Sequence, residues 1–199
     1  MEKAKNPIVG IDLAASPLNP TGWALLSDSR LSVQQLFADK KILEETTKRA
    51  PDLAAIDAPL SLPKNKHAYM READKEMHRK GYHVLPPRFK SMEKLTLRAS
   101  SIARQLRKEG VEVIEVHPLS SRKALNIPAK DWAAIQKVFT RIGFSGDLQQ
   151  RKLTPHEIDA VSAVLTGYLH LKRKTELIGS PKEGVIVLPK PRDWRTLSL

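Results

Sequence analysis

The chain has 199 residues, of which 41% are hydrophobic, and it contains no cysteine. This length predicts one domain spanning residues 1–199, and the lack of cysteine excludes disulfides, thiolate metal sites and a cysteine nucleophile. The 34 Lys and Arg residues outnumber the 22 Asp and Glu residues, and the net charge of +12 favours nucleic acid as a partner. Because Asp12 interrupts the N-terminal apolar stretch, we expect neither a signal peptide nor a membrane-spanning helix, and the cytoplasm is the default location.

Short apolar runs predict the first elements. Ile8–Leu13, Gly22–Leu26 and Leu31–Phe37 are expected to be three strands joined by short turns, which indicates an antiparallel meander. A short helix is predicted over Lys40–Arg49, and Leu53–Ala58 is predicted as a fourth strand. We expect the fourth strand to return beside the first through a crossover.

The segment around residues 60–90 is predicted to be a basic helical insertion, with a helix from about Met70 to Arg79. This segment contains eight basic and three acidic residues, so it contributes +5 to the net charge. The segment is either an ordinary solvated surface or a surface that contacts phosphates. Aromatic residues make up only 5% of the chain, so no stacking platform for single strands is predicted.

The second half of the chain continues the alternation. A helix from Ser91 ends at Gly110, Val111–Val116 is predicted as a fifth strand, and Asp131–Ile142 as a further helix. The sequence Thr154-Pro155-x-Glu157 is typical of a helix start, with a threonine cap, a proline at the first helical position and a glutamate that bonds back to the cap. A strand is expected from Gly184, after which Pro189 and Pro191 loosen a basic C-terminal tail.

Four carboxylates stand in otherwise apolar surroundings. Asp12 follows PIVGI, Asp57 follows LAAI, Glu115 follows VEVI, and Asp159 lies near the start of the last helix. Isolated anions are costly to bury unless a cation receives them, and a metal ion is the simplest receiver. The alternatives are a turn cap for Asp12 and Asp57, an ion pair for Glu115, and a favourable helix-dipole interaction for Asp159.

The predicted order of elements is that of the ribonuclease H-like fold, a mixed five-stranded α/β sheet of order 3-2-1-4-5 flanked by helices. In this order the fourth strand lies beside the first. Asp12 and Asp57 would then lie on neighbouring strands, which are about 4.8 Å apart. Glu115, two strands from Asp12, would lie about 10 Å away by the same spacing, and it is the weaker ligand candidate.

Five stretches of the chain also resemble a known group. They are GIDLAASPLNPTGWALL, AIDAPLSLP, MREADKEMHRKGY, VIEVHPLSSRKAL and HEIDAVSAVLTGYL, and together they resemble the domain-of-unknown-function family 429, predicted nucleases of ribonuclease H-like fold. The resemblance implies a divalent-metal phosphodiesterase with Asp12, Asp57 and Asp159 as its acidic core. It also draws attention to Arg71, Asp74, Glu115 and His117.

The leading hypothesis is therefore a metal-dependent nuclease that cleaves DNA or RNA by a two-metal mechanism. Asp12, Asp57 and Asp159 would bind Mg²⁺ or Mn²⁺ ions roughly 3.5 to 4 Å apart, because oxygen ligands suit these ions, with Glu115 as a further catalytic candidate. His117 is either an acid or base group or a hydrogen-bonded loop histidine. Arg71, Arg88 and Arg98 are the candidates for holding phosphate.

Two other classes remain as alternatives. A non-catalytic nucleic-acid-binding module of the same fold would bind without cleaving and without needing metal. An ATP-handling relative of the actin and sugar-kinase superfamily is disfavoured, because those proteins use two such domains and this length provides one.

Overall fold

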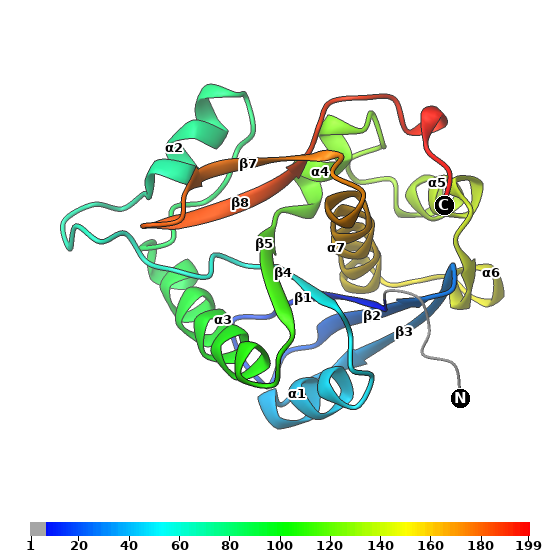
Figure 1. Cartoon of the computed structure of the whole chain (residues 1–199), viewed down its shortest axis with the longest axis horizontal. Coiled ribbons are helices and arrows are strands. Elements are labelled where there is room, and N and C mark those ends of the chain that lie inside the picture. The colour runs from blue at the N-terminus through cyan, green and yellow to red at the C-terminus, as the bar shows by residue number, and fades with distance from the viewer. Residues whose placement is uncertain (1–6) are drawn as a thin grey trace.

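The computed structural model describes residues 7–199, which form an eight-stranded mixed sheet with helices on both faces (Figure 1). The strand order across the sheet is β6-β3-β2-β1-β4-β5-β8-β7. The strands are β1 Ile8–Asp12, β2 Thr21–Ser27, β3 Arg30–Leu36, β4 Leu53–Asp57, β5 Glu112–Val116, β6 Ser145–Gly146, β7 Thr175–Ser180 and β8 Gly184–Pro189. The helices are α1 Asp39–Thr47, α2 Glu72–Arg79, α3 Lys90–Lys108, α4 Pro118–Ala124, α5 Trp132–Ile142, α6 Asp147–Gln150 and α7 Pro155–Leu171, and a 3₁₀ helix spans Trp194–Thr196.

The predicted fold class is confirmed, because the first five strands have the order 3-2-1-4-5. Strands β1, β2 and β3 pair antiparallel, while β4 pairs parallel with both β1 and β5. The sheet is larger than the five strands of the expected fold: β6 extends the β3 edge, and β8, which is the strand expected from Gly184, extends the β5 edge together with β7. Strand β7 has a weak apolar pattern, with Ile178 buried and Leu177 62% exposed, which explains why it was missed.

The sheet separates two apolar cores. Along β1, Ile8 contributes to the core on the α7 side, whereas Val9 and Ile11 contribute to the core beneath α3, as expected from alternating side chains. Helices α4 and α5 join α7 on the first face, and α1 and α3 cover the second (Figure 1). Because both faces of β1 and β4 are covered, their sequences are continuous apolar runs that end in a carboxylate.

Helix α7 begins as predicted and lies directly on the sheet. Thr154 accepts a hydrogen bond from the Glu157 N–H, and the Glu157 carboxylate accepts one from the Thr154 N–H. A Cβ added at Gly10 would lie 2.1 Å from the Ala160 carbonyl oxygen, and one added at Gly22 would lie 2.0 Å from the His156 carbonyl oxygen. The glycines of β1 and β2 therefore allow the α7 backbone to approach the sheet closely.

The C-terminal region is packed, in contrast to the loose tail expected from its prolines. Ile186 and Leu188 of β8 form a third apolar cluster with Ala73 and Met77 of α2. Trp194 is 8% exposed within the core on the α7 side. The apolar side chains of the last residues thus outweigh the effect of the prolines, and β8 connects the 60–90 segment to the sheet.

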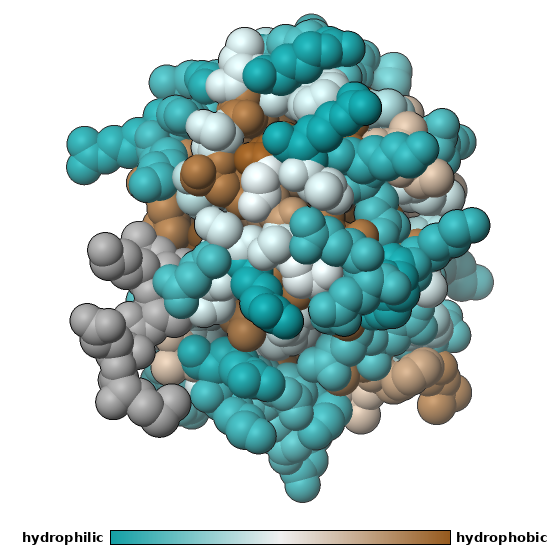
Figure 2. Space-filling view, turned by 90° about the vertical axis from the view of Figure 1, so that its right-hand side faces the viewer, coloured by the Kyte–Doolittle hydropathy of each residue, from teal (hydrophilic) through white to brown (hydrophobic). Residues whose placement is uncertain are grey.

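The face seen from the right-hand side of Figure 1 is covered mainly by hydrophilic side chains, with smaller apolar areas between them (Figure 2). Between residues 7 and 199, no helix combines the length and apolar character needed to cross a membrane.

Candidate metal centre

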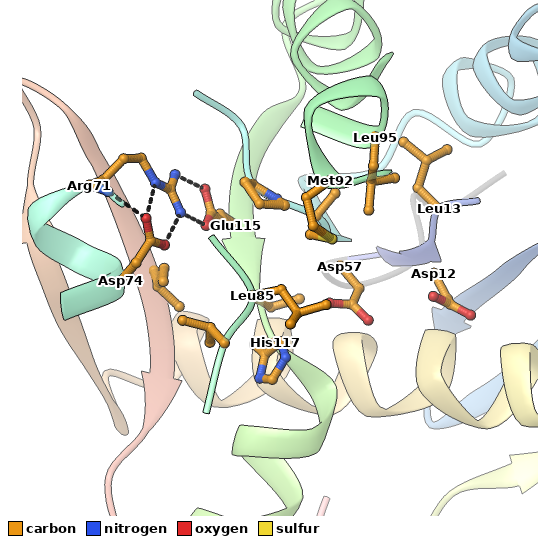
Figure 3. A pocket seen from close by; sticks show the side chains of 15 residues that line it. Asp12, Leu13, Asp57, Arg71, Asp74, Leu85, Met92, Leu95, Glu115 and His117 are labelled. Carbon is orange, nitrogen blue, oxygen red and sulfur yellow. Dashed lines mark hydrogen bonds and ion pairs between the residues drawn. The ribbon is translucent and has the colours of Figure 1, made fainter. Parts of the chain in front are cut away.

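Asp12 and Asp57 lie side by side at the carboxyl ends of two neighbouring parallel strands. Each is the last residue of its strand, and the register of β1 and β4 pairs them directly. Neighbouring strands are about 4.8 Å apart, so the two carboxylates lie close enough to share a cation. Both side chains line the same pocket and are labelled in Figure 3.

The electrostatics of this pair disfavour two negative charges. The pKa of Asp12 is raised from 3.8 to about 6: burial is the largest cause and the charge of Asp159 adds to it, while the hydrogen bond with His156 opposes the rise. Burial raises the pKa of Asp57 well above its ordinary value, and the charges of Asp12 and Asp159 add to this effect. A cation beside the pair would relieve both the burial cost and the repulsion.

Helix α7 contributes the third carboxylate and a histidine. Asp159 lies one turn into the helix, and its charge acts on both Asp12 and Asp57. His156 Nδ1 lies 2.7 Å from Asp12 Oδ2, and about half of its side chain is exposed. The capped start of α7, which rests on Gly22, thus brings both residues to the end of β1.

An arginine on another helix binds Asp159. The buried Arg122 of α4 donates from Nη1 to Asp159 Oδ1 and to Ser162 Oγ. Across residues 7–199, no three His, Asp or Glu side chains are already arranged around a common metal position. The oxygen donors of Asp12 and Asp57 fit a hard divalent cation such as Mg²⁺ or Mn²⁺, and Asp159 would join them only after leaving Arg122.

The structure does not bring Glu115 to this pair. Its two carboxylate oxygens accept from Arg71 Nη2 at 2.6 Å and Nη1 at 2.8 Å, and the Leu60 N–H donates to it at 2.8 Å. Arg71 also binds Asp74, and Figure 3 shows this cluster on the far side of the pocket from Asp12. Glu115 therefore forms an ion pair, which the sequence analysis gave as the alternative to metal binding.

The three arginines expected to hold phosphate all have partners within the protein. Arg71 is 1% exposed within the cluster just described. Arg88 donates to the carbonyl oxygens of Ala68 and Pro63. Arg98 binds Asp39 and the carbonyl oxygens of Ala14 and Phe37. These guanidinium groups hold loops to the fold. Apart from Asp74, which is three residues from Arg71, most of their partners are distant along the chain, so local sequence does not reveal them.

His117 caps α4 and lines the pocket. Its Nδ1 accepts from the Ser120 N–H and lies 2.7 Å from Ser120 Oγ. Burial, with the charge of Arg122 as a smaller cause, lowers the pKa of His117 to about 4. The ring is therefore neutral at pH 7, and with Nδ1 accepting, its proton is on Nε2. Of the two roles considered for His117, this geometry favours the hydrogen-bonded histidine over the acid or base group.

The pocket has a volume of about 220 Å³ and lies between the start of α3 and the segment that precedes it. Met92 and Leu95 of α3 form one apolar wall, and Val84 and Leu85 belong to the other (Figure 3). The Asp12–Asp57 pair lies at one end of this pocket and the Arg71 cluster at the other.

Sequence reasoning missed two residues of the centre, His156 and Arg122. The spacing of His156 and Asp159, three residues apart in a helix, places them on one face and was a usable signal. Arg122 lies within the quoted stretch VIEVHPLSSRKAL, but its pairing with a carboxylate 37 residues away follows only from the fold.

The sheet order and its flanking helices define a ribonuclease H-like fold with paired carboxylates at its centre. Residues 10–131, more than half of the chain, match the family described as "Protein of unknown function (DUF429)", and the chain belongs to this family. The stretch HEIDAVSAVLTGYL lies beyond the matched residues.

The fold is similar to that of RuvC from Thermus thermophilus. RuvC in complex with a Holliday junction substrate has a TM-score of 0.52 and 14% identity, with 84% of this chain and 96% of that chain covered. A second T. thermophilus RuvC structure has a TM-score of 0.46 and 15% identity over the same shares. At this sequence identity, the similarity to RuvC concerns the fold and no other property. No curated protein matches the chain.

Proposed function

We propose that this protein is a divalent-metal-dependent nuclease that hydrolyses phosphodiester bonds in nucleic acid, with Asp12, Asp57 and Asp159 as its acidic core. The observation that carries the proposal is the direct pairing of Asp12 with Asp57 at the carboxyl ends of β1 and β4. Two partly buried carboxylates that repel each other are costly unless they serve to bind a cation.

Each residue of the centre would have a defined task. Asp12 and Asp57 would hold the cation, and His156 would orient Asp12 through its hydrogen bond of 2.7 Å. Asp159 would move from Arg122 to the other carboxylates when the cation is present. The chemistry supplied by a bound divalent cation is activation of water and neutralisation of charge at the phosphate.

Nucleic acid is the substrate class that the charge favours. The net charge of +12 attracts polyanions, and Lys64, Lys66, Lys90 and Lys94 are exposed in the segment around the pocket. The RuvC structure with a similar fold contains a Holliday junction, so a four-way junction belongs among the substrates to be tested.

A second candidate is a nucleic-acid-binding module without catalysis. The observation that favours it is the ion pair between Arg122 and Asp159, which supplies a cation to the third carboxylate without a metal ion. Such a module would bind the same substrates and would need no metal ion.

One assay separates these candidates. Purified protein is incubated with Mg²⁺ or Mn²⁺ and labelled single strands, duplexes and four-way junctions of DNA and RNA, together with Asp12→Asn and Asp57→Asn. Glu109→Gln, which removes an exposed charge at the end of α3, is the control. The nuclease proposal expects metal-dependent cleavage by the wild type and the control, and none by the other two. Binding without cleavage under any ion would favour the second candidate, and equal cleavage by all four proteins would refute the proposed centre.

A further inference from the structure

The pocket beside Asp57 has the features of a binding site for one apolar ring. Nine of its fifteen lining residues are apolar, among them two of α3 and residues 84–85, and the other six are the ionisable residues Asp12, Asp57, Arg71, Asp74, Glu115 and His117. Its volume of about 220 Å³ is small beside the roughly 300 to 1,000 Å³ of sites for larger ligands. It therefore suits a single ring system and excludes a paired, stacked duplex.

The position of the pocket links its occupant to the proposed chemistry. Asp12 and Asp57 belong to the pocket lining, so a ring held there is adjacent to any group bound by the carboxylates. In a nucleic acid each base is attached to a sugar, and a phosphodiester joins that sugar to the next. A strand whose phosphate reaches the Asp12–Asp57 pair would thus have a base within reach of Met92 and Leu85 (Figure 3).

The pocket also contains a hydrogen-bond donor for a base edge. His117 lines it, and Nδ1 of this histidine already accepts from the Ser120 N–H. The neutral ring therefore presents Nε2–H as a donor, which suits a carbonyl oxygen or ring nitrogen of a base. Aliphatic walls with a hydrogen-bond donor among them match the combination that recognises an extruded base.

Two exposed aromatic residues lie near the same end of α3. The side chain of Tyr69 is 63% exposed and that of Phe89 is 56% exposed. Leu85, which lines the pocket, is 61% exposed. The Arg88 N–H donates to the Tyr69 carbonyl oxygen at 3.3 Å, so the two aromatic segments are neighbours. Exposed aromatic residues among lysines are the composition of a surface that binds unpaired strands.

We propose that this pocket receives one unpaired nucleobase from the strand whose phosphate lies at Asp12 and Asp57, while Tyr69 and Phe89 stack on bases outside it. The inference rests on the proposed function and deepens it, because it limits the substrate class to nucleic acids with an unpaired nucleotide at the reacting position. The recognition would come from the shape and apolar character of the pocket.

The test measures binding rather than cleavage. All proteins carry Asp12→Asn so that the probes stay intact, and the probes are short labelled duplexes of DNA and of RNA. Each duplex is fully paired, contains one unpaired adenine, or contains an abasic nucleotide at the same position. Fluorescence anisotropy in Mg²⁺ gives the affinities. We expect the unpaired adenine to bind about tenfold more tightly than the abasic probe, the effect of one base stacked on side chains.

Two further variants locate the effect. Leu85→Ala removes an exposed pocket wall and should abolish most of the adenine preference, whereas Leu97→Ala removes a similarly exposed leucine of α3 outside the pocket and should keep it. Equal affinity for the adenine and abasic probes would overturn the inference while leaving the proposed nuclease intact. Failure to bind any probe, both in these proteins and in the wild type in EDTA, would overturn both proposals, and a preference unchanged by Leu85→Ala would overturn the assignment to this pocket.

Discussion

Replacing Asp12 with asparagine should stabilise the metal-free protein at neutral pH. Burial raises the pKa of Asp12 from 3.8 in the unfolded chain to about 6. The fold therefore disfavours the charged form, so stability is lost as the pH rises from 3.8 through 6. Since one pKa unit is worth about 1.4 kcal/mol, the loss above pH 6 is about 3 kcal/mol, and asparagine avoids it.

The expected gain is large enough to measure. For a chain of this length, a gain of about 3 kcal/mol raises Tm by roughly 6 to 12 °C. The lost hydrogen bond between His156 and a charged Asp12 reduces this gain. Thermal unfolding followed by circular dichroism at pH 7.5 in EDTA compares the wild type, Asp12→Asn and the control Glu109→Gln.

Metal and pH provide the internal checks. At pH 4 the difference between Asp12→Asn and the wild type should nearly vanish, because most of the native Asp12 is then protonated. Adding Mn²⁺ should stabilise the wild type and have a smaller effect on Asp12→Asn, because a ligand that binds the native state stabilises it. An Asp12→Asn protein that is less stable than the wild type at pH 7.5 in EDTA would refute the electrostatic reasoning.

Four other changes test the surrounding structure. Arg71→Met should destabilise the fold by about 3 to 5 kcal/mol in urea unfolding, because Glu115 and Asp74 stay buried without their partner. The contribution of His117 to stability should fall by at most about 3 kcal/mol as the pH drops from 6.5 to about 4, because its lowered pKa favours protonation in the unfolded chain; this change is opposite in sign to that of Asp12, so it is measured as the difference between the wild type and His117→Gln in urea unfolding at each pH. Gly22→Ala should lower Tm, since its Cβ would meet the His156 carbonyl oxygen and overpacking costs about 1 to 3 kcal/mol. Arg122→Leu should bind Mn²⁺ more tightly in calorimetry because Asp159 is released, and unchanged affinity would show that the ion pair does not compete with metal.

The central sheet could be predicted from the sequence because its strands are short apolar runs separated by clear turns. The pairing of Asp12 with Asp57 followed from the order 3-2-1-4-5, since parallel neighbours that both end in a carboxylate bring these residues together. Strand β7 could not be predicted in the same way, because it lies at the sheet edge and buries little apolar surface.

The site was less predictable where it depends on contacts between distant segments. The position of Glu115 in an apolar strand indicates a cationic partner, but only the fold shows that this partner is Arg71, 44 residues away in the chain. Arg122 was missed for the same reason, because its carboxylate partner is on another helix. Local patterns identify which charges are buried, and the tertiary structure decides what neutralises them.

The contact of α7 with Gly10 and Gly22 limits how the third carboxylate can reach the other two. The helix backbone already touches the strands, so it has no space in which to slide inward. Assembly of the three carboxylates must then come from rotation about the side-chain bonds of Asp159, with exchange of its arginine partner. Rotation of one side chain is faster than movement of a whole helix, so loading with a cation should need no slow rearrangement of the backbone.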